Sequence, residues 1–245
     1  MKRCYIVGAG EFFGNISPSE SDCFIAADGG LITLLSLGIM PDIIIGDFDS
    51  LDYDALFEKL CKFEEKNSKM APVLKKYTKI TTKAECADII KNVFENCEMI
   101  THPSEKDETD MYLAYQCGKE KGCDEFYLYG GVGGREDHTF ANYCLLLKAK
   151  RDEKEVFLMG NKTKIFVIEN ESIDVFGTPG DTISIFAFGG DAEGVSISGM
   201  KYAAENVTLG MDFPLGVSNE FAGNGKGKIS VSNGALLVMM QNVEK

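Results

Sequence analysis

The feature that most constrains the fold is a pattern repeated through the first 150 residues. Short apolar runs occupy residues 5–7, 24–27, 43–45 and 126–129, and glycine follows each run within two positions. Continuous apolar runs rich in β-branched residues are typical of parallel strands that are buried on both faces of a sheet. Parallel strands need long crossovers, usually helices, so this half of the chain is predicted to be an α/β domain.

The crossovers are predicted to be helical. Helical spacing is seen at residues 31–37, which Gly38 closes, and from about residue 138 to 148. The charged stretch 51–106 gives weaker signals, apart from helical spacing at Ala87, Ile90 and Phe94. We therefore expect helices packed around the sheet edge in this stretch.

The pattern changes after the charged segment 148–155. Short runs with β-branched residues then recur about every ten positions, separated by turns rich in glycine, asparagine and aspartate. This pattern predicts a small antiparallel sandwich or barrel. The predicted domains are therefore an α/β domain at 1–150 and an all-β domain at 155–245.

Composition excludes several functional classes. The 245 residues carry 25 basic and 38 acidic side chains, a net charge of −13 that argues against binding nucleic acid. A phosphate ligand would then need a divalent cation between itself and the protein. We expect neither a transmembrane helix nor a signal peptide. The eight cysteines form no CxxC pair, so we expect reduced, buried thiols in a cytoplasmic protein.

The strongest chemical signal follows the apolar run at 43–45. In an extended chain Asp47 and Asp49 lie on the same side, where the strand ends and where open α/β sheets bind ligands. Their mutual repulsion amounts to several kcal/mol at an effective dielectric constant of about 20, and a cation held by carboxylate oxygens would offset it. An acidic turn that caps the next helix explains the same residues.

Two further acidic segments follow the same logic. Asp28 comes directly after an apolar run and precedes Gly29 and Gly30, which permit a ligand to approach the backbone. Asp107 and Asp110 share a face if a helix begins at Asp107. An ordinary strand-to-helix turn explains the first group equally, and acidic residues that stabilise a helix start explain the second.

A glycine-rich loop follows the apolar run at 126–129. Gly130, Gly131, Gly133 and Gly134 allow the loop to wrap around a phosphate group, and the next residue, Arg135, supplies a cation. Asp137 is predicted to cap the helix that follows.

Taken together, these segments resemble the thiamine pyrophosphokinase family. The resemblance rests on ADGG at 27–30, PDIIIGDFDS at 41–50, KDETD at 106–110 and YGGVGGREDHTFAN at 129–142, in the family's order. The second half of the chain is similar at VSNE (217–220) and GALL (234–237). The resemblance implies a Rossmann-like parallel-sheet domain followed by a β-sandwich that binds thiamine, in a homodimer with sites between protomers.

The family's activity is the transfer of a pyrophosphoryl group from ATP to the hydroxyl of thiamine, with Mg²⁺ and with AMP as the second product. By resemblance, the metal and the ATP phosphates are held by Asp28, Asp47, Asp49 and Asp110. Asp107 and Arg135 lie beside them, Gly29, Gly30, Gly133, Gly134 and Asp137 contact the nucleotide, and Ser218 and Asn219 face thiamine. A nearby carboxylate is expected to take the hydroxyl proton, and the sequence does not decide between Asp107 and Asp49.

Two departures from the family keep alternatives open. The chain has no tryptophan to stack on thiamine, and the stretch 52–106 is longer than the family's usual connection. One alternative is a related ATP pyrophosphotransferase that acts on another alcohol, such as a pterin. Another is a non-catalytic module that senses nucleotides. Release of AMP in the presence of a particular alcohol distinguishes the three functions.

Overall fold

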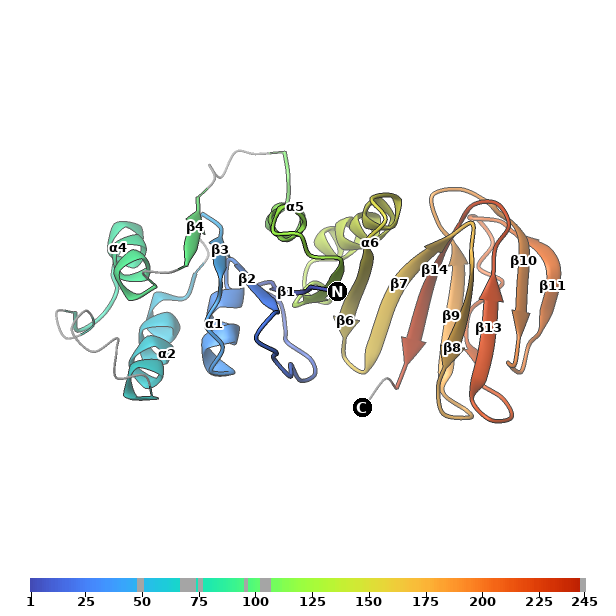
Figure 1. Ribbon diagram of the computed structural model, residues 1–245, viewed down its shortest axis with the longest axis horizontal. Helices are drawn as coiled ribbons and strands as arrows, with labels where there is room; N and C mark the ends of the chain where they lie inside the picture. The colour runs from blue at the N-terminus through green and yellow to red at the C-terminus, as the bar shows by residue number, and fades with distance from the viewer. Residues whose placement is uncertain (48–50, 67–73, 75–76, 95–96, 102–106, 243–245) are drawn as a thin grey trace. The chain divides into compact units, whose positions relative to one another are not determined.

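The computed structural model describes residues 1–47, 51–66, 74, 77–94, 97–101 and 107–242 (Figure 1). The chain divides into two compact units. The first comprises Met1–Phe12 and Ile16–Gly134, and the second comprises Phe13–Asn15 and Arg135–Lys245. Within the described residues, every helix is too short or too polar to cross a membrane.

The first unit is built on the predicted parallel sheet. Its strands are β1 (Arg3–Val7), β2 (Cys23–Ala27), β3 (Ile43–Ile45), β4 (Glu98–Ile100) and β5 (Glu125–Tyr129), in the spatial order β5-β1-β2-β3-β4. All neighbouring pairs in this row are parallel. The residues of β2 and β3 are all buried, which explains why these strands read as continuous apolar runs.

Helices connect these strands: α1 (Gly30–Ser36), α2 (Tyr53–Lys66), α4 (Lys83–Val93) and α5 (Asp110–Glu120). The helices expected within residues 51–106 are present as α2 and α4, but this stretch also contains β4, which was not expected and which pairs with β3 at the end of the sheet. The strand has only three residues, one of them charged and none fully buried, so it leaves no apolar run in the sequence.

The second unit begins with α6 (Glu136–Arg151), and its strands form two antiparallel sheets. One sheet contains β6 (Glu155–Gly160), β7 (Thr163–Glu169), β9 (Thr182–Ala187), β12 (Asn219–Glu220) and β14 (Ala235–Gln241). The other contains β8 (Ser172–Phe176), β10 (Ala192–Ser198), β11 (Ala204–Leu209) and β13 (Lys226–Ser230). Apolar side chains of both sheets share one core, so the predicted all-β sandwich is confirmed.

The helix α6 belongs to the second unit because it packs on β6 and β7. The compact division therefore falls earlier in the chain than the boundary predicted at 148–155. That charged segment marks instead the change from helix to strand, since α6 ends at Arg151 and β6 begins at Glu155.

The cysteines depart in part from expectation. All eight are free thiols, as predicted. Cys4, Cys23, Cys86 and Cys123 are buried, but Cys61, Cys97 and Cys117 are half-buried and Cys144 is exposed. Cys61, Cys117 and Cys144 lie within α2, α5 and α6, where only one face of the helix is covered.

Candidate functional site

The carboxyl edge of the parallel sheet gathers the loops that carry the acidic and glycine-rich motifs. Backbone hydrogen bonds continue the pairing beyond the strand ends. Gly8 N donates to Tyr129 O at 2.8 Å, and Gly10 N donates to Gly130 O at 3.1 Å. Gly46 N likewise donates to Ile100 O at 3.3 Å. The segments after β1, β3, β4 and β5 therefore meet along one edge, where α/β sheets bind their ligands.

Asp28 lies at this edge in an uncommon backbone conformation. Its φ is +48°, and its N–H donates to the carbonyl of Ile45 at 2.8 Å, the last residue of β3. A non-glycine residue in the left-handed region costs of order 1 kcal/mol, and such strain is concentrated at functional sites. The backbone of Asp28 is thus held against the end of β3, directly before Gly46 and Asp47.

The absence of a side chain at Gly46 leaves room for the carboxylate of Asp28. A Cβ atom at Gly46 would lie 2.0 Å from Asp28 Oδ1, and the φ of Gly46 is +154°. The carboxylate therefore occupies the space that any other residue at position 46 would fill. The structure brings Asp28 next to the backbone that leads into Asp47, which is half-buried. Asp28 and Asp47 were predicted from the sequence but Gly46 was not; the glycine after the buried strand is visible in the sequence, whereas its closeness to Asp28 is not.

Asp110 reaches the same edge through α5, which runs antiparallel to the strands. A Cβ at Gly8, just beyond β1, would lie 2.9 Å from Met111 Cε at the start of the helix. A Cβ at Gly118, near the end of the helix, would lie 2.9 Å from Cys4 Sγ at the start of β1. The half-buried Asp110 is therefore at the carboxyl edge.

The shared helical face predicted for Asp107 and Asp110 is absent. The helix begins at Asp110, and the side chain of Thr109 caps it by accepting a hydrogen bond from Tyr112 N at 3.2 Å. Asp107 lies exposed before the cap. Asp110 lies in the first helical turn, where a carboxylate stabilises the helix, so the structural explanation given for it in the sequence holds.

The glycine residues divide into two groups. Gly133 and Gly134 have φ values of +80° and +75°, and a Cβ on either would meet nothing within 4 Å. The positive φ values, rather than close packing, explain why glycine stands at these two positions of an open loop. Gly30 is explained by packing, because a Cβ there would lie 1.8 Å from Val7 O. Gly29 precedes it as the N-cap of α1.

Arg135 and Asp137 begin the second unit as an exposed ion pair. Arg135 Nε donates to Asp137 Oδ1 at 3.1 Å, and Arg135 Nη2 donates to Asp137 Oδ2 at 2.5 Å. The guanidinium group lowers the pKa of Asp137 to about 2. The prediction that Asp137 caps α6 is wrong, because Arg135 occupies the N-cap and Asp137 is the second residue of the helix.

Ser218 and Asn219 lie in different environments. Ser218 is exposed, has a φ of +57° and donates its N–H to Ser184 Oγ at 3.0 Å. Asn219 is buried, and its amide oxygen accepts hydrogen bonds from the N–H groups of Tyr202 and Glu220, both at 2.9 Å. The amide nitrogen of Asn219 donates to Tyr202 O at 2.8 Å. Asn219 therefore ties two segments of the sandwich together.

An exposed apolar segment, residues 211–217, leads into Ser218 and was not singled out in the sequence. Met211, Phe213, Leu215 and Val217 are between 46% and 65% exposed, and the ring of Tyr202 is 59% exposed. A segment with several exposed apolar side chains is typical of surfaces that bind a ligand or a partner. The signal in the sequence was an apolar run that contains proline and glycine and therefore cannot be an interior strand.

The donors at the carboxyl edge suit a hard cation. Asp28, Asp47 and Asp110 offer carboxylate oxygens, the ligands that Mg²⁺ prefers, and Gly46 leaves room for one of them. Asp49, the fourth predicted ligand, lies outside the described residues. Within the described part of the chain, these three carboxylates do not approach one another closely enough to form a group with all ligand atoms within 4.8 Å.

Comparison with known proteins gives consistent results across both halves of the chain. A family model described as "Thiamin pyrophosphokinase, catalytic domain" matches residues 17–158, and one described as "Thiamin pyrophosphokinase, vitamin B1 binding domain" matches residues 163–236. The curated thiamine pyrophosphokinase of Bacillus subtilis (strain 168) is 27% identical over 221 residues, which are 90% of this chain and 87% of the relative.

Solved structures show the same relationship. A crystal structure of thiamine pyrophosphokinase from Bacillus subtilis has a TM-score of 0.77 and 25% identity, with 99% of this chain and all of the other covered. Thiamin pyrophosphokinase from Candida albicans has a TM-score of 0.63 at 16% identity, over 98% of this chain and 88% of the other, and shows the shared fold.

Proposed function

The chain belongs to the thiamin pyrophosphokinase family of enzymes, and we propose that it transfers the pyrophosphoryl group of ATP to the hydroxyl of thiamine, giving thiamine diphosphate and AMP. The observation that carries this proposal is that the catalytic and vitamin B1-binding models match consecutive segments that together span most of the chain. The carboxylates at the sheet edge supply the chemistry that such a reaction needs.

Mg²⁺ and the ATP phosphates bind at the carboxyl edge of the first unit. The metal ligands are Asp28, Asp47, Asp49 and Asp110. The carboxylate of Asp28 occupies the space that a side chain at position 46 would fill. When bound, Mg²⁺ offsets the negative charge of these carboxylates and of the phosphate oxygens. It also resolves the conflict between an anionic substrate and a chain with a net charge of −13.

The chain's own residues align the reactants and bind their charge. Phosphoryl-type transfer needs little covalent help, and most of the rate enhancement comes from positioning and electrostatic stabilisation. The loop with Gly133 and Gly134 wraps around the phosphates, and Arg135 neutralises charge that develops on them. A carboxylate, Asp107 or Asp49, accepts the proton of the thiamine hydroxyl.

Thiamine is held by the sandwich of the second unit, which matches the vitamin B1-binding model. Ser218 offers an exposed hydroxyl, and the buried Asn219 holds the adjoining backbone. In a chain without tryptophan, the exposed rings of Tyr202 and Phe213 supply aromatic surface for the thiamine rings. The apolar segment 211–217 also supports a homodimer.

Eight free thiols suit a reducing compartment, which supports a cytoplasmic location for the enzyme.

The test is a product assay with the full-length protein. ATP, Mg²⁺ and thiamine are incubated with the enzyme, and thiamine diphosphate and AMP are quantified by chromatography. Parallel reactions contain a hydroxymethyl pterin or no acceptor. We expect the two products in equal amounts, and only with thiamine. AMP release with the pterin alone, or tight ATP binding without AMP release for either acceptor, would refute the proposal.

A further inference from the structure

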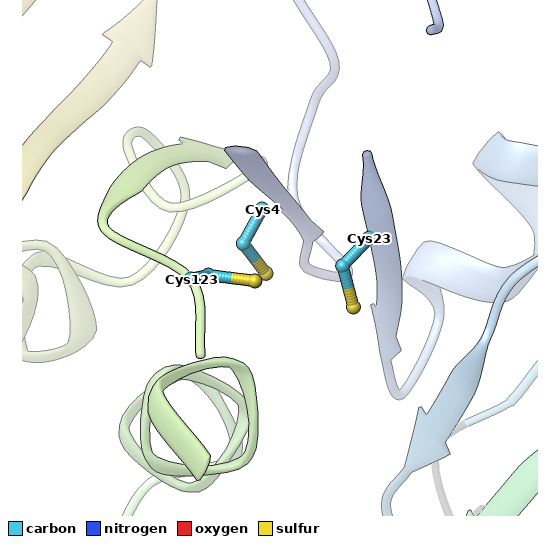
Figure 2. A group of neighbouring side chains, drawn as sticks. All are labelled: Cys4, Cys23 and Cys123. Atoms are coloured by element: carbon cyan, nitrogen blue, oxygen red, sulfur yellow. The ribbon is translucent and has the colours of Figure 1, made fainter. Parts of the chain in front are cut away.

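Three buried cysteines meet at the other edge of the parallel sheet, away from the carboxylates (Figure 2). Cys4 and Cys23 are register partners near the starts of β1 and β2, and Cys123 precedes β5 by two residues. Their Sγ atoms all lie within 4.8 Å of one another. Figure 2 shows the sulfur atoms of Cys4 and Cys123 turned toward each other, with that of Cys23 on the same side of the strands.

The backbone around this cluster is well defined. Cys123 N donates to Gly118 O at 3.1 Å, which fixes the segment between α5 and β5. Gly118 itself leaves room for Cys4 Sγ, since a Cβ there would lie 2.9 Å from that sulfur. Cys4 and Cys123 are 0% exposed and Cys23 is 4% exposed. The three thiols therefore converge from fixed backbone positions in the sheet.

The spacing of the sulfur atoms fits a thiolate-bound metal ion. When three sulfurs are no more than 4.8 Å apart, a point equidistant from them in their plane lies at most about 2.8 Å from each. A zinc–sulfur bond is about 2.3 Å long, so a movement of roughly 0.5 Å per side chain would complete such a site. Thiolate sulfur selects Zn²⁺ and Cu⁺ over Mg²⁺, which binds oxygen.

The surroundings provide access and charge. A cavity of about 800 Å³ opens beside Cys23, and Lys2, Lys121, Asp42 and Glu98 are among its lining residues. Glu20 and Asp22 also line it, and Lys121 is paired with Glu98 at 2.7 Å, so the lining is acidic on balance and attracts cations. The cavity gives ions and protons a route to solvent.

We propose that Cys4, Cys23 and Cys123 bind one thiophilic metal ion with a filled d shell, Zn²⁺ or Cu⁺. Binding breaks three S–H bonds, forms three metal–sulfur bonds and releases three protons to solvent, with no electron transferred. The ion ties the starts of β1 and β2 to the segment before β5, and so links residues that are far apart in the sequence. This inference stands independently of the proposed function.

The experiment uses full-length protein, reduced with a phosphine, stripped of metal and kept under nitrogen. Co²⁺ is titrated as a spectroscopic probe for Zn²⁺, and Cu⁺ is titrated in competition with a chromogenic chelator. We expect sulfur-to-Co²⁺ charge-transfer absorption that saturates at one equivalent and is displaced by Zn²⁺, or one equivalent of Cu⁺ taken from the chelator. The titration that saturates at one equivalent shows whether the site binds Zn²⁺ or Cu⁺.

Variants assign the ligands. Cys4→Ser, Cys23→Ser and Cys123→Ser should each weaken metal binding by about 100-fold or more, since loss of a group that merely supports a ligand already costs 10- to 100-fold. The matched controls are Cys86→Ser, at a thiol that is equally buried, and Cys144→Ser, at an exposed one. Both controls should bind metal like the wild type.

Several results would overturn the proposal. They are the absence of stoichiometric binding of both Co²⁺ and Cu⁺ by the wild type, unchanged binding by the Cys123→Ser variant, and a disulfide between two of the three cysteines in anaerobically purified protein. Circular dichroism identifies any variant that fails to fold. The melting temperature of the wild type, which bound metal should raise, then provides a readout that needs no variant.

Discussion

Replacing Gly46 by alanine should disable the enzyme without unfolding it. The added Cβ would lie 2.0 Å from Asp28 Oδ1, whereas a non-bonded carbon and oxygen stay about 3.3 Å apart. The carboxylate, or the turn that carries Asp47, must therefore move by about 1.3 Å. A misplacement of about 1 Å can cost 100-fold in rate, which corresponds to about 2.7 kcal/mol of transition-state stabilisation.

The accompanying loss of stability should be too small to unfold a protein of ordinary stability. The φ of +154° at Gly46 adds backbone strain of about 1–3 kcal/mol for alanine. Gly38→Ala is the matched control, because Gly38 also has a positive φ, +74°, but a Cβ there meets nothing within 4 Å. It should lose stability through strain alone and keep its turnover.

The assay measures turnover as thiamine diphosphate formed over time at saturating ATP and thiamine, across a range of Mg²⁺ concentrations. We expect Gly46→Ala to fall about 100-fold in kcat and to need more Mg²⁺. Gly38→Ala should remain within about twofold of the wild type. Normal turnover and normal Mg²⁺ dependence in Gly46→Ala would show that the position of the Asp28 carboxylate does not matter for catalysis.

Three further predictions concern other parts of the molecule. Asp47→Asn and Asp49→Asn should each reduce turnover by about 10³ or more, as several kcal/mol of charge stabilisation are lost; near-normal kcat in both would contradict the metal assignment. Because Arg135 depresses the pKa of Asp137 to about 2, the ion pair stabilises the fold above the ordinary carboxyl pKa and loses this effect as pH falls through 2. The carboxyl carbon of Asp137 should titrate near 2 by NMR, and Arg135→Ala should return it toward 3.8, whereas an unchanged midpoint would exclude the pairing. Asn219→Ala should lower the free energy of unfolding by about 2 kcal/mol in a denaturant titration, because two backbone N–H groups and a carbonyl lose their partner; a change below about 0.5 kcal/mol would argue against this role.

The sequence predicted the strands best where both faces of a strand are buried. The runs at 24–27 and 43–45 match β2 and β3 closely, since every residue in these strands is buried. It was uninformative for β4, whose three residues include the exposed Glu98 and whose pairing with β3 is a tertiary interaction. The strand β8 has little apolar pattern either, since only Val175 among its five residues is buried.

The candidate site was partly predictable for the same reason. Parallel strands place their carboxyl ends together, so Asp28 and Asp47 could be assigned to one edge from the sequence alone. The start of α5 could not, because capping by Thr109, rather than the acidic residues before it, sets the first helical turn. The close approach of Gly46 to Asp28 depends on the distance between two loops, which no local pattern encodes.

The cysteine cluster shows most clearly what could not be predicted from the sequence. Cys4, Cys23 and Cys123 have no motif spacing, and only the order of strands β5-β1-β2 brings them together. The sequence predicts three separate buried thiols, which is correct for their burial but says nothing of their proximity.

The most direct test of the central claim is a crystal structure with Mn²⁺ in place of Mg²⁺, thiamine and a non-hydrolysable ATP analogue, with the metal located by its anomalous scattering. The expected result is a peak at the carboxyl edge of the parallel sheet, with oxygens of Asp47 and of at least one of Asp28, Asp49 and Asp110 bound to the metal. Metal bound to the nucleotide phosphates elsewhere, with none of these aspartates in contact, would contradict it.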